Sequence, residues 1–146
     1  MIKATVSTKE SQITRAWQVI DLKDQTLGRM ATKIAELLMG KTKPYFVRNL
    51  DCGDHVVVLN AKDFIATGNK EKLKVYTRYS GYPGGLKSET LGRLRNRKPE
   101  EVIRHAVSGM LPKNRLRDKM LKRLYVFADD KHPYEEKFKK EEGSSK

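Results

Sequence analysis

The sequence predicts a single α/β domain in which helices pack against a mainly parallel central sheet. A strand-like segment at residues 17–20 is followed by apolar residues at helical spacing over residues 27–38. Residues 56–59, Val-Val-Val-Leu, are an uninterrupted apolar run, typical of a strand that is buried on both faces of a parallel sheet. The order strand, helix, buried strand is that of a βαβ unit and favours a three-layer fold.

Length and composition limit the class of protein. At 146 residues the chain can form one domain with a hydrophobic core but not two. The one cysteine, Cys52, excludes an internal disulfide and indicates a reducing compartment. No apolar run approaches the roughly 20 residues of a membrane span, and residues 1–12 lack the apolar segment of a secretory signal. We therefore expect a cytoplasmic protein with no membrane partner.

The first half of the chain gives clear element boundaries. Residues 1–16 have no periodicity, so we expect an irregular arm there. The first strand should end at Asp21, and the following helix should have Thr26 as its N-cap and Gly40 as its stop. Residues 72–79 alternate between polar and apolar types, which predicts an exposed strand or extended segment. Residues 81–85 have the composition of a loop.

The second half predicts two more helices and a final strand. Pro99 fits the first position of a helix, and two glutamates follow it in the first turn. We expect Gly109 to end this helix with a positive φ. Another helix should start near Asn114, before a strand at residues 124–127. The expected division is a single domain with a core and binding region at 17–133 and, at 134–146, a flexible tail.

Positive charge is concentrated in residues 68–123. This segment holds 16 Lys and Arg but five Asp and Glu, so it carries eleven of the thirteen net positive charges of the chain. Such a surface repels itself unless a polyanion covers it, which indicates nucleic acid. Tyr76, Tyr79 and Tyr82 are interleaved with these cations, and aromatic faces stack on unpaired bases. The alternative, an ordinary solvated face, would normally mix the two signs of charge.

Other residues leave a catalytic alternative open. Asp51, Asp54 and His55 precede the buried strand and are the right types for an acid/base or metal site, or for a polar turn. The first assignment would make the protein an RNA-processing or RNA-modifying enzyme. Cys52 is either a nucleophile or a buried thiol, and the thiol is favoured. His105 and His132 lack metal-ligand spacing, so no metal is expected.

Residues 108–114, Ser-Gly-Met-Leu-Pro-Lys-Asn, resemble the signature of the bacterial ribosomal protein L-thirteen family of the large subunit. The resemblance extends in order through most of the chain, over residues 17–21, 27–31, 40–44, 53–61, 67–70, 74–76, 82–87 and 132–133. The chain departs from the family at Arg117, where a glycine is common, and after Pro133, where Gln-x-Pro often follows.

The resemblance implies a three-layer α/β/α fold around a four-stranded, mainly parallel sheet with basic loop and helical extensions. It also implies a structural, non-catalytic role in the ribosome, with large-subunit rRNA and neighbouring large-subunit ribosomal proteins as partners and a part in early subunit assembly. No cofactor and no small-molecule substrate are expected. With the charge pattern, it predicts RNA contacts by Lys41, Lys43, Lys70, Lys72, Lys74, Arg78, Tyr79, Tyr82, Gly84, Gly85, Lys87, Arg93, Arg95, Arg97, Lys113, Asn114, Arg115, Arg117, Lys122 and Arg123.

Overall fold

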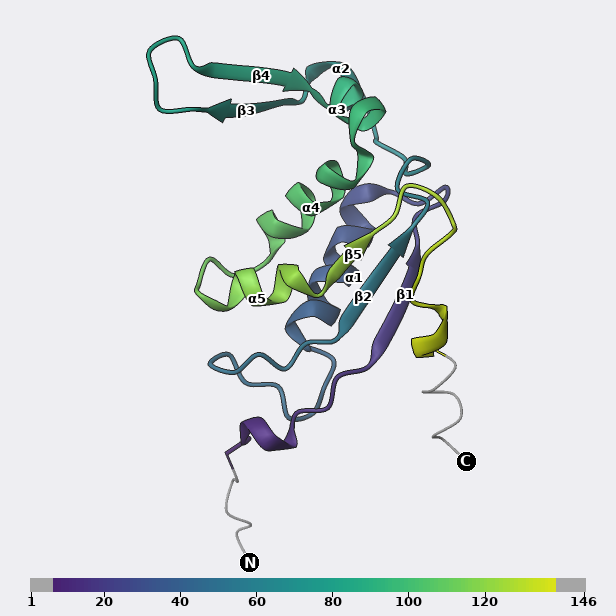
Figure 1. Cartoon of the computed structure of the whole chain (residues 1–146), viewed down its shortest axis with the longest axis vertical. Helices are drawn as coiled ribbons and strands as arrows, with labels where there is room; N and C mark the ends of the chain where they lie inside the picture. Colours follow the sequence, from purple (N-terminus) through teal and green to yellow (C-terminus); the bar gives the residue numbers. More distant parts are fainter. Residues whose placement is uncertain (1–6, 139–146) are drawn as a thin grey trace, which may run out of the picture.

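A computed structural model describes residues 7–138 of the chain as a mixed α/β fold (Figure 1). The elements in chain order are η1 (Glu10–Gln12), β1 (Trp17–Asp21), α1 (Leu27–Met39), β2 (His55–Leu59), α2 (Lys70–Leu73), β3 (Val75–Tyr79), β4 (Leu86–Thr90), α3 (Leu91–Arg97), α4 (Pro99–Met110), α5 (Leu116–Lys122) and β5 (Leu124–Val126). No helix among these described residues is long and apolar enough to cross a membrane.

The central sheet has three parallel strands in the order β1-β2-β5. Residues 56–58 of the middle strand are fully buried, because β1 and β5 flank β2 and side chains cover both of its faces. This confirms the strand that the apolar run predicts. The described residues form three strands in this sheet, where the family resemblance implies four.

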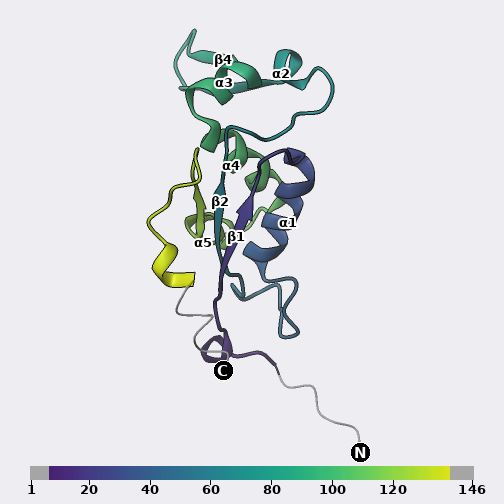
Figure 2. The same ribbon diagram turned by 90° about the vertical axis from the view of Figure 1, so that its right-hand side faces the viewer.

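One face of the sheet is covered by α1 and α4, which also pack on each other (Figure 2). The apolar spacing that predicts α1 places Met30, Ile34 and Leu38 in the core, and α4 adds residues such as Ile103. The predicted ends of α1 are confirmed: Thr26 is its N-cap residue, and Gly40 follows its last turn with φ of 74°.

The opposite face of the sheet carries an aromatic cluster. Trp17 stacks on His55 with ring centroids 4.3 Å apart, and on Tyr125 at 5.5 Å. Tyr134 and Phe138, from the C-terminal segment, lie 5.2 Å and 6.2 Å from Trp17. This C-terminal segment therefore covers the second face, and its packing on the aromatic cluster continues past residue 133. The rest of the expected tail, residues 139–146, lies outside the described residues.

His55 makes the stability of this cluster depend on pH. Burial lowers the pKa of His55, and the charges of Arg123, Arg15 and Lys137 lower it further. The unfolded chain therefore takes up this proton at a higher pH than the folded chain, and stability is lost as pH falls. We expect the free energy of unfolding to decrease between about pH 7 and pH 5. Urea unfolding followed by Trp17 fluorescence measures it.

The control is His55→Phe, which keeps a ring against Trp17 but has no proton to gain. Its unfolding free energy should depend less on pH over the same range. An identical pH dependence in the wild-type protein and this variant would show that His55 does not contribute.

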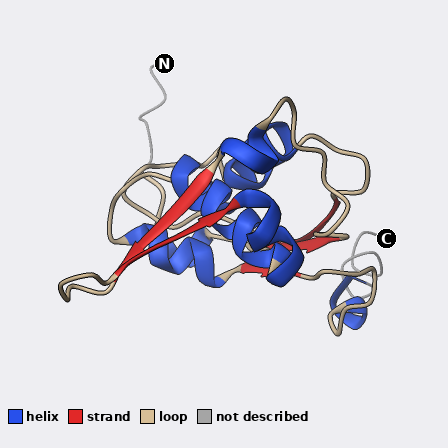
Figure 3. Ribbon diagram, turned by 90° about the horizontal axis from the view of Figure 1, so that it is seen from above, coloured by secondary structure: helices blue, strands red, loops and turns tan. Residues whose placement is uncertain are grey.

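The basic segment contains a β-hairpin that the sequence predicts only in part. The expected exposed strand at 72–79 is β3, preceded by the short helix α2. It pairs antiparallel with β4, and the hairpin projects from the body of the molecule (Figure 3). The connecting loop has positive φ at Gly81 and Gly84, as its composition indicates.

The expected role of Gly109 is wrong. Helix α4 continues to Met110, and Gly109 lies within it without a positive φ. A Cβ atom added there would meet no heavy atom within 4 Å. The end of α4 is instead set by Leu111, whose extended backbone leaves the helix before Pro112. A larger residue at Gly109 therefore creates no backbone strain of the kind that the sequence suggests.

Candidate nucleic-acid interface

The hairpin and helices α3 and α4 enclose a groove of about 990 Å³. Its walls carry five cationic side chains and two carboxylates, together with Tyr76 and His105. We call it the basic groove; its charged residues are Arg78, Lys87, Glu89, Arg93, Arg97, Glu101 and Arg104.

The hairpin register explains how one wall of the basic groove is built. Arg78 pairs with Lys87 across the strands, and Tyr76 pairs with Glu89. Side chains two residues apart on a strand share a face, so these four side chains lie on the same side of the hairpin. That side faces α4, which brings Arg78 and Lys87 to the groove with Arg104 opposite.

Most of the groove cations are free to meet a ligand. Among residues 7–138, Arg78, Lys87, Arg93 and Arg104 form no ion pair with a carboxylate. Arg97 differs, because its guanidinium donates to both oxygens of the Glu89 carboxylate, at 3.1 and 2.7 Å, and this contact lowers the pKa of Glu89. The unpaired cations give the groove a positive potential that suits phosphate.

The tip of the hairpin is exposed. Tyr79 and Tyr82 expose 65% and 74% of their surface, which leaves their rings available for stacking. Gly84, with φ of 70°, and Gly85 form the turn between them and β4, and the Gly85 amide donates to the Tyr82 carbonyl at 2.9 Å. A Cβ at Gly85 would lie 2.0 Å from Ser80 Oγ and 2.9 Å from the Tyr82 carbonyl oxygen, so a side chain here would force the backbone of the turn to shift.

A second group of cations lies between α4 and α5. Lys113 and Arg115 are exposed, and Arg117 is half-buried. Asn114 has a structural role, because its side-chain oxygen accepts hydrogen bonds from the Leu116 and Arg117 amides, at 3.1 and 3.2 Å, and so caps the start of α5. The cap fixes the loop that presents Lys113 and Arg115 to solvent.

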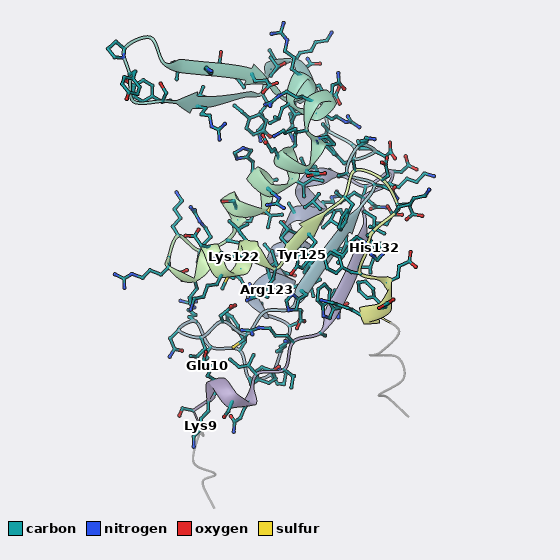
Figure 4. The ribbon with its side chains drawn as sticks, viewed as in Figure 1. Lys9, Glu10, Lys122, Arg123, Tyr125 and His132 are labelled. Atoms are coloured by element: carbon teal, nitrogen blue, oxygen red, sulfur yellow. The ribbon has the colours of Figure 1, made fainter. Side chains whose placement is uncertain are left out.

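Lys70, Lys72 and Lys74 are exposed along α2 and at the start of β3, and Lys41 is exposed after α1. None of them lines the basic groove, but Lys74 Nζ lies 5.4 Å from the centroid of the Tyr76 ring in its wall. Lys122 is exposed at the end of α5, next to Arg123 (Figure 4).

Arg123 is placed differently from its neighbour Lys122. It is 7% exposed, and its guanidinium donates to both carboxylate oxygens of Asp51. The same side chain donates to the Leu38 carbonyl at 3.1 Å and the Asp54 carbonyl at 3.3 Å. Arg123 therefore joins α1, the loop before β2, and β5, with its buried guanidinium bonded to acceptors within the fold.

Lys43 and Arg95 are likewise held inside the fold. Lys43 Nζ forms an ion pair with Asp54 and donates to the Thr14 carbonyl. Arg95 pairs with Glu71 and donates to the Phe64 carbonyl at 2.8 Å, with its guanidinium over the Phe64 ring. Of the twenty residues expected at the interface, Lys43, Arg95 and Arg123 thus stabilise the core, and we do not place them against RNA.

The geometry of Asp51, Asp54 and His55 supports the polar-turn assignment. Both carboxylates are occupied by cations of the fold, and His55 is stacked on Trp17. Among the described residues no group of three or more His, Cys, Asp or Glu side chains could hold a metal ion. Cys52 is fully buried as a free thiol, as the sequence favours.

Sequence reasoning did not single out Arg104 and His105, which line the basic groove, as RNA contacts. Both lie on α4 and line the basic groove beside Tyr76. A signal was present, because Arg104 and His105 are polar residues directly after the apolar pair Val102 and Ile103. On an amphipathic helix that position faces away from the core.

Comparison with known proteins gives a consistent result. A family model described as Ribosomal protein L13 matches residues 15–133. The "Large ribosomal subunit protein uL13" of Geobacter sulfurreducens is 49% identical over 134 residues, covering 92% of this chain and 94% of that protein. The protein of the same name from Corynebacterium diphtheriae is 50% identical over 131 residues, covering 90% and 89%. That from Dehalococcoides mccartyi is 50% identical over 130 residues, covering 89% and 91%.

Proposed function

Because this chain belongs to the ribosomal protein L13 family, we propose that it is a structural constituent of the large ribosomal subunit that binds large-subunit rRNA through the basic groove. Its relatives are ribosomal proteins and not enzymes, so the carboxylates beside His55 are structural and not catalytic. The expected location is the ribosome in the cytoplasm, and the expected neighbours are other large-subunit proteins.

The observation that supports the proposal most directly is that the cations of the protein fall into two groups. Among residues 7–138, some form ion pairs within the fold, and others, gathered in the basic groove, do not. Lys43, Arg95 and Arg123 are neutralised by carboxylates within the fold. Four groove cations are left without such a partner among residues 7–138, although they face one another across a confined space. Cations gathered this closely repel each other, and a phosphate backbone that enters between them removes the repulsion.

The exposed tyrosines at the hairpin tip and the cations at 113–115 extend this surface on either side of α4. The hairpin and α5 both project on the same side of the molecule, with α4 between them (Figure 1). RNA that fills the basic groove would therefore also reach Lys113 and Arg115. Irregular, partly single-stranded RNA fits such a surface better than a straight duplex, because it can bend around the hairpin.

A role in early subunit assembly requires binding to rRNA that carries no other protein. The groove is formed entirely by elements of this chain, so it is complete before any neighbour joins. We therefore propose that the protein binds naked large-subunit rRNA and that neighbouring ribosomal proteins are added afterwards.

The experiment is a titration of purified protein with protein-free large-subunit rRNA at several salt concentrations. If the four unpaired groove cations and Lys113 each neutralise one phosphate, the plot of log affinity against log salt should have a slope of about −3.5, using about 0.7 per single-stranded contact. RNA should remain intact throughout. A slope near zero would show that the cations do not contact phosphates, and cleavage of the RNA would favour an enzyme.

A further inference from the structure

We propose that the basic groove holds one unpaired nucleotide of the RNA, with its base stacked on the ring of His105. This inference rests on the proposed RNA binding and adds a specific subsite to it. The class of ligand is a nucleotide that is not base-paired, held by its base at His105 and by its flanking phosphates at the arginines.

Two walls of the groove meet in a stack of aromatic rings. The rings of Tyr76 on β3 and His105 on α4 are stacked, with centroids 5.3 Å apart and planes 28° from parallel. Tyr76 is half-buried and packs against the hydrophobic core, whereas His105 is exposed. His105 therefore presents a ring to the groove that is supported from behind by a second ring.

Packing fixes the supporting ring of Tyr76. The Tyr76 hydroxyl is buried and has no hydrogen-bond partner within the described structure. Burial raises the pKa of Tyr76, so the phenol stays neutral. A buried hydroxyl without a partner is unfavourable, and it persists here because the ring fills the space between the hairpin and the helices. The ring below His105 is held by its packing against the core, so less conformational freedom is left to lose when a base stacks there.

Cations flank the stacked rings. Arg104 precedes His105 on α4, and Arg78 lies two residues after Tyr76 on β3, so a cation stands beside each ring of the stack. A base on His105 would have its two phosphates on either side, within the reach of these long side chains. This arrangement of a ring between cations suits a nucleotide, whose base can stack on the ring while its phosphates meet the cations. A lone phosphate ion would contact the cations but has no base to stack on the rings.

The size of the groove and its polar groups limit the ligand. A volume of about 990 Å³ is within the range of small-ligand sites, so the groove has room for one or two nucleotides. Both groove carboxylates are held by cations of the fold: Glu89 by Arg97, and Glu101 by Lys98 at 3.2 Å. They are not free to read the edge of a base, so the stacking should tolerate any base and favour large purines.

The test uses two ten-nucleotide oligouridylates. One carries 2-aminopurine at its centre, and the other carries an abasic site there. We expect the wild-type protein to quench the 2-aminopurine fluorescence and to bind that strand about tenfold more tightly than the abasic strand, as stacking of one base provides. His105→Phe, which keeps a ring, should retain both effects. His105→Ala should bind the two strands equally and quench little.

The outcomes separate this subsite from the proposed function. Loss of salt-dependent binding to rRNA in the wild-type protein would overturn the proposed function itself. Salt-dependent binding without preference for the 2-aminopurine strand would overturn the subsite alone. Quenching by His105→Ala equal to that of the wild type would also overturn it. Because His105 is exposed, the alanine variant should keep the wild-type melting temperature, and a matching melting curve is the control for folding.

Discussion

Replacing Arg123 with alanine is expected to lower the free energy of unfolding by about 3–5 kcal/mol, which is a large part of the stability of a small domain. The change leaves the Asp51 carboxylate, whose side chain is 11% exposed, without its bidentate partner. It also removes the donors to the Leu38 and Asp54 carbonyls. Arg15, 3.7 Å from the same carboxylate and itself exposed, replaces only part of this interaction. Loss of the buried partner is strongly destabilising, so the melting temperature should fall on the order of 10 °C.

The matched control is Lys122→Ala, one residue earlier in the chain. Lys122 is exposed, whereas its neighbour Arg123 is buried. Its removal should change stability by no more than about 0.5 kcal/mol. Urea unfolding followed by Trp17 fluorescence compares the two variants. Equal stability of Arg123→Ala and Lys122→Ala would contradict the structural role of Arg123.

The second large effect is on RNA affinity. The triple variant Arg78→Ala, Lys87→Ala, Arg93→Ala removes three unpaired cations from the basic groove. Each lost phosphate contact should reduce the salt slope by about 0.7, and at 0.1 M salt the three together should weaken rRNA binding on the order of 100-fold. The melting temperature should change little, because none of the three side chains belongs to an ion pair within residues 7–138.

The control for net charge is the triple variant Lys9→Ala, Lys23→Ala, Lys131→Ala. These lysines are exposed and lie outside the basic groove. The two triple variants have the same net charge, so a general attraction between protein and RNA would weaken equally in both. We expect the control to keep most of its affinity. Equal losses would show that net charge, and not the groove, determines binding.

The sequence predicts the core well because the apolar pattern within each short segment shows which of its residues are buried. Residues 56–58 are apolar in succession since β2 is buried on both faces, and the spacing of α1 follows its contact with α4. Strand β4 is different. Its sequence, Leu-Lys-Ser-Glu-Thr, is largely polar and does not by itself indicate a strand. This strand forms because β3 supplies its hydrogen-bond partners, and the residues of β4 alone do not predict that pairing.

The candidate interface could be predicted only as a segment. The distribution of charge along the sequence identifies residues 68–123 as the basic segment, but it predicts the same RNA-binding role for Lys122 and Arg123. Their different roles depend on Asp51, 72 positions away, which the fold brings to Arg123. Likewise, the exposed face of α4 becomes part of a groove only because the hairpin folds over it. Tertiary contacts decide which cations are neutralised, and a linear charge pattern cannot show them.

Competitive incorporation into particles tests whether the basic groove attaches this protein to large-subunit rRNA. Wild-type protein and a variant, isotopically distinguished and mixed in equal amounts, are reconstituted with large-subunit rRNA and the other subunit proteins. The particles are sedimented and the ratio in them is measured by mass spectrometry. We predict that the groove triple variant is strongly depleted and that the Lys9, Lys23, Lys131 variant is incorporated like the wild type. Equal incorporation of the groove variant would show that the basic groove does not hold the protein on the rRNA.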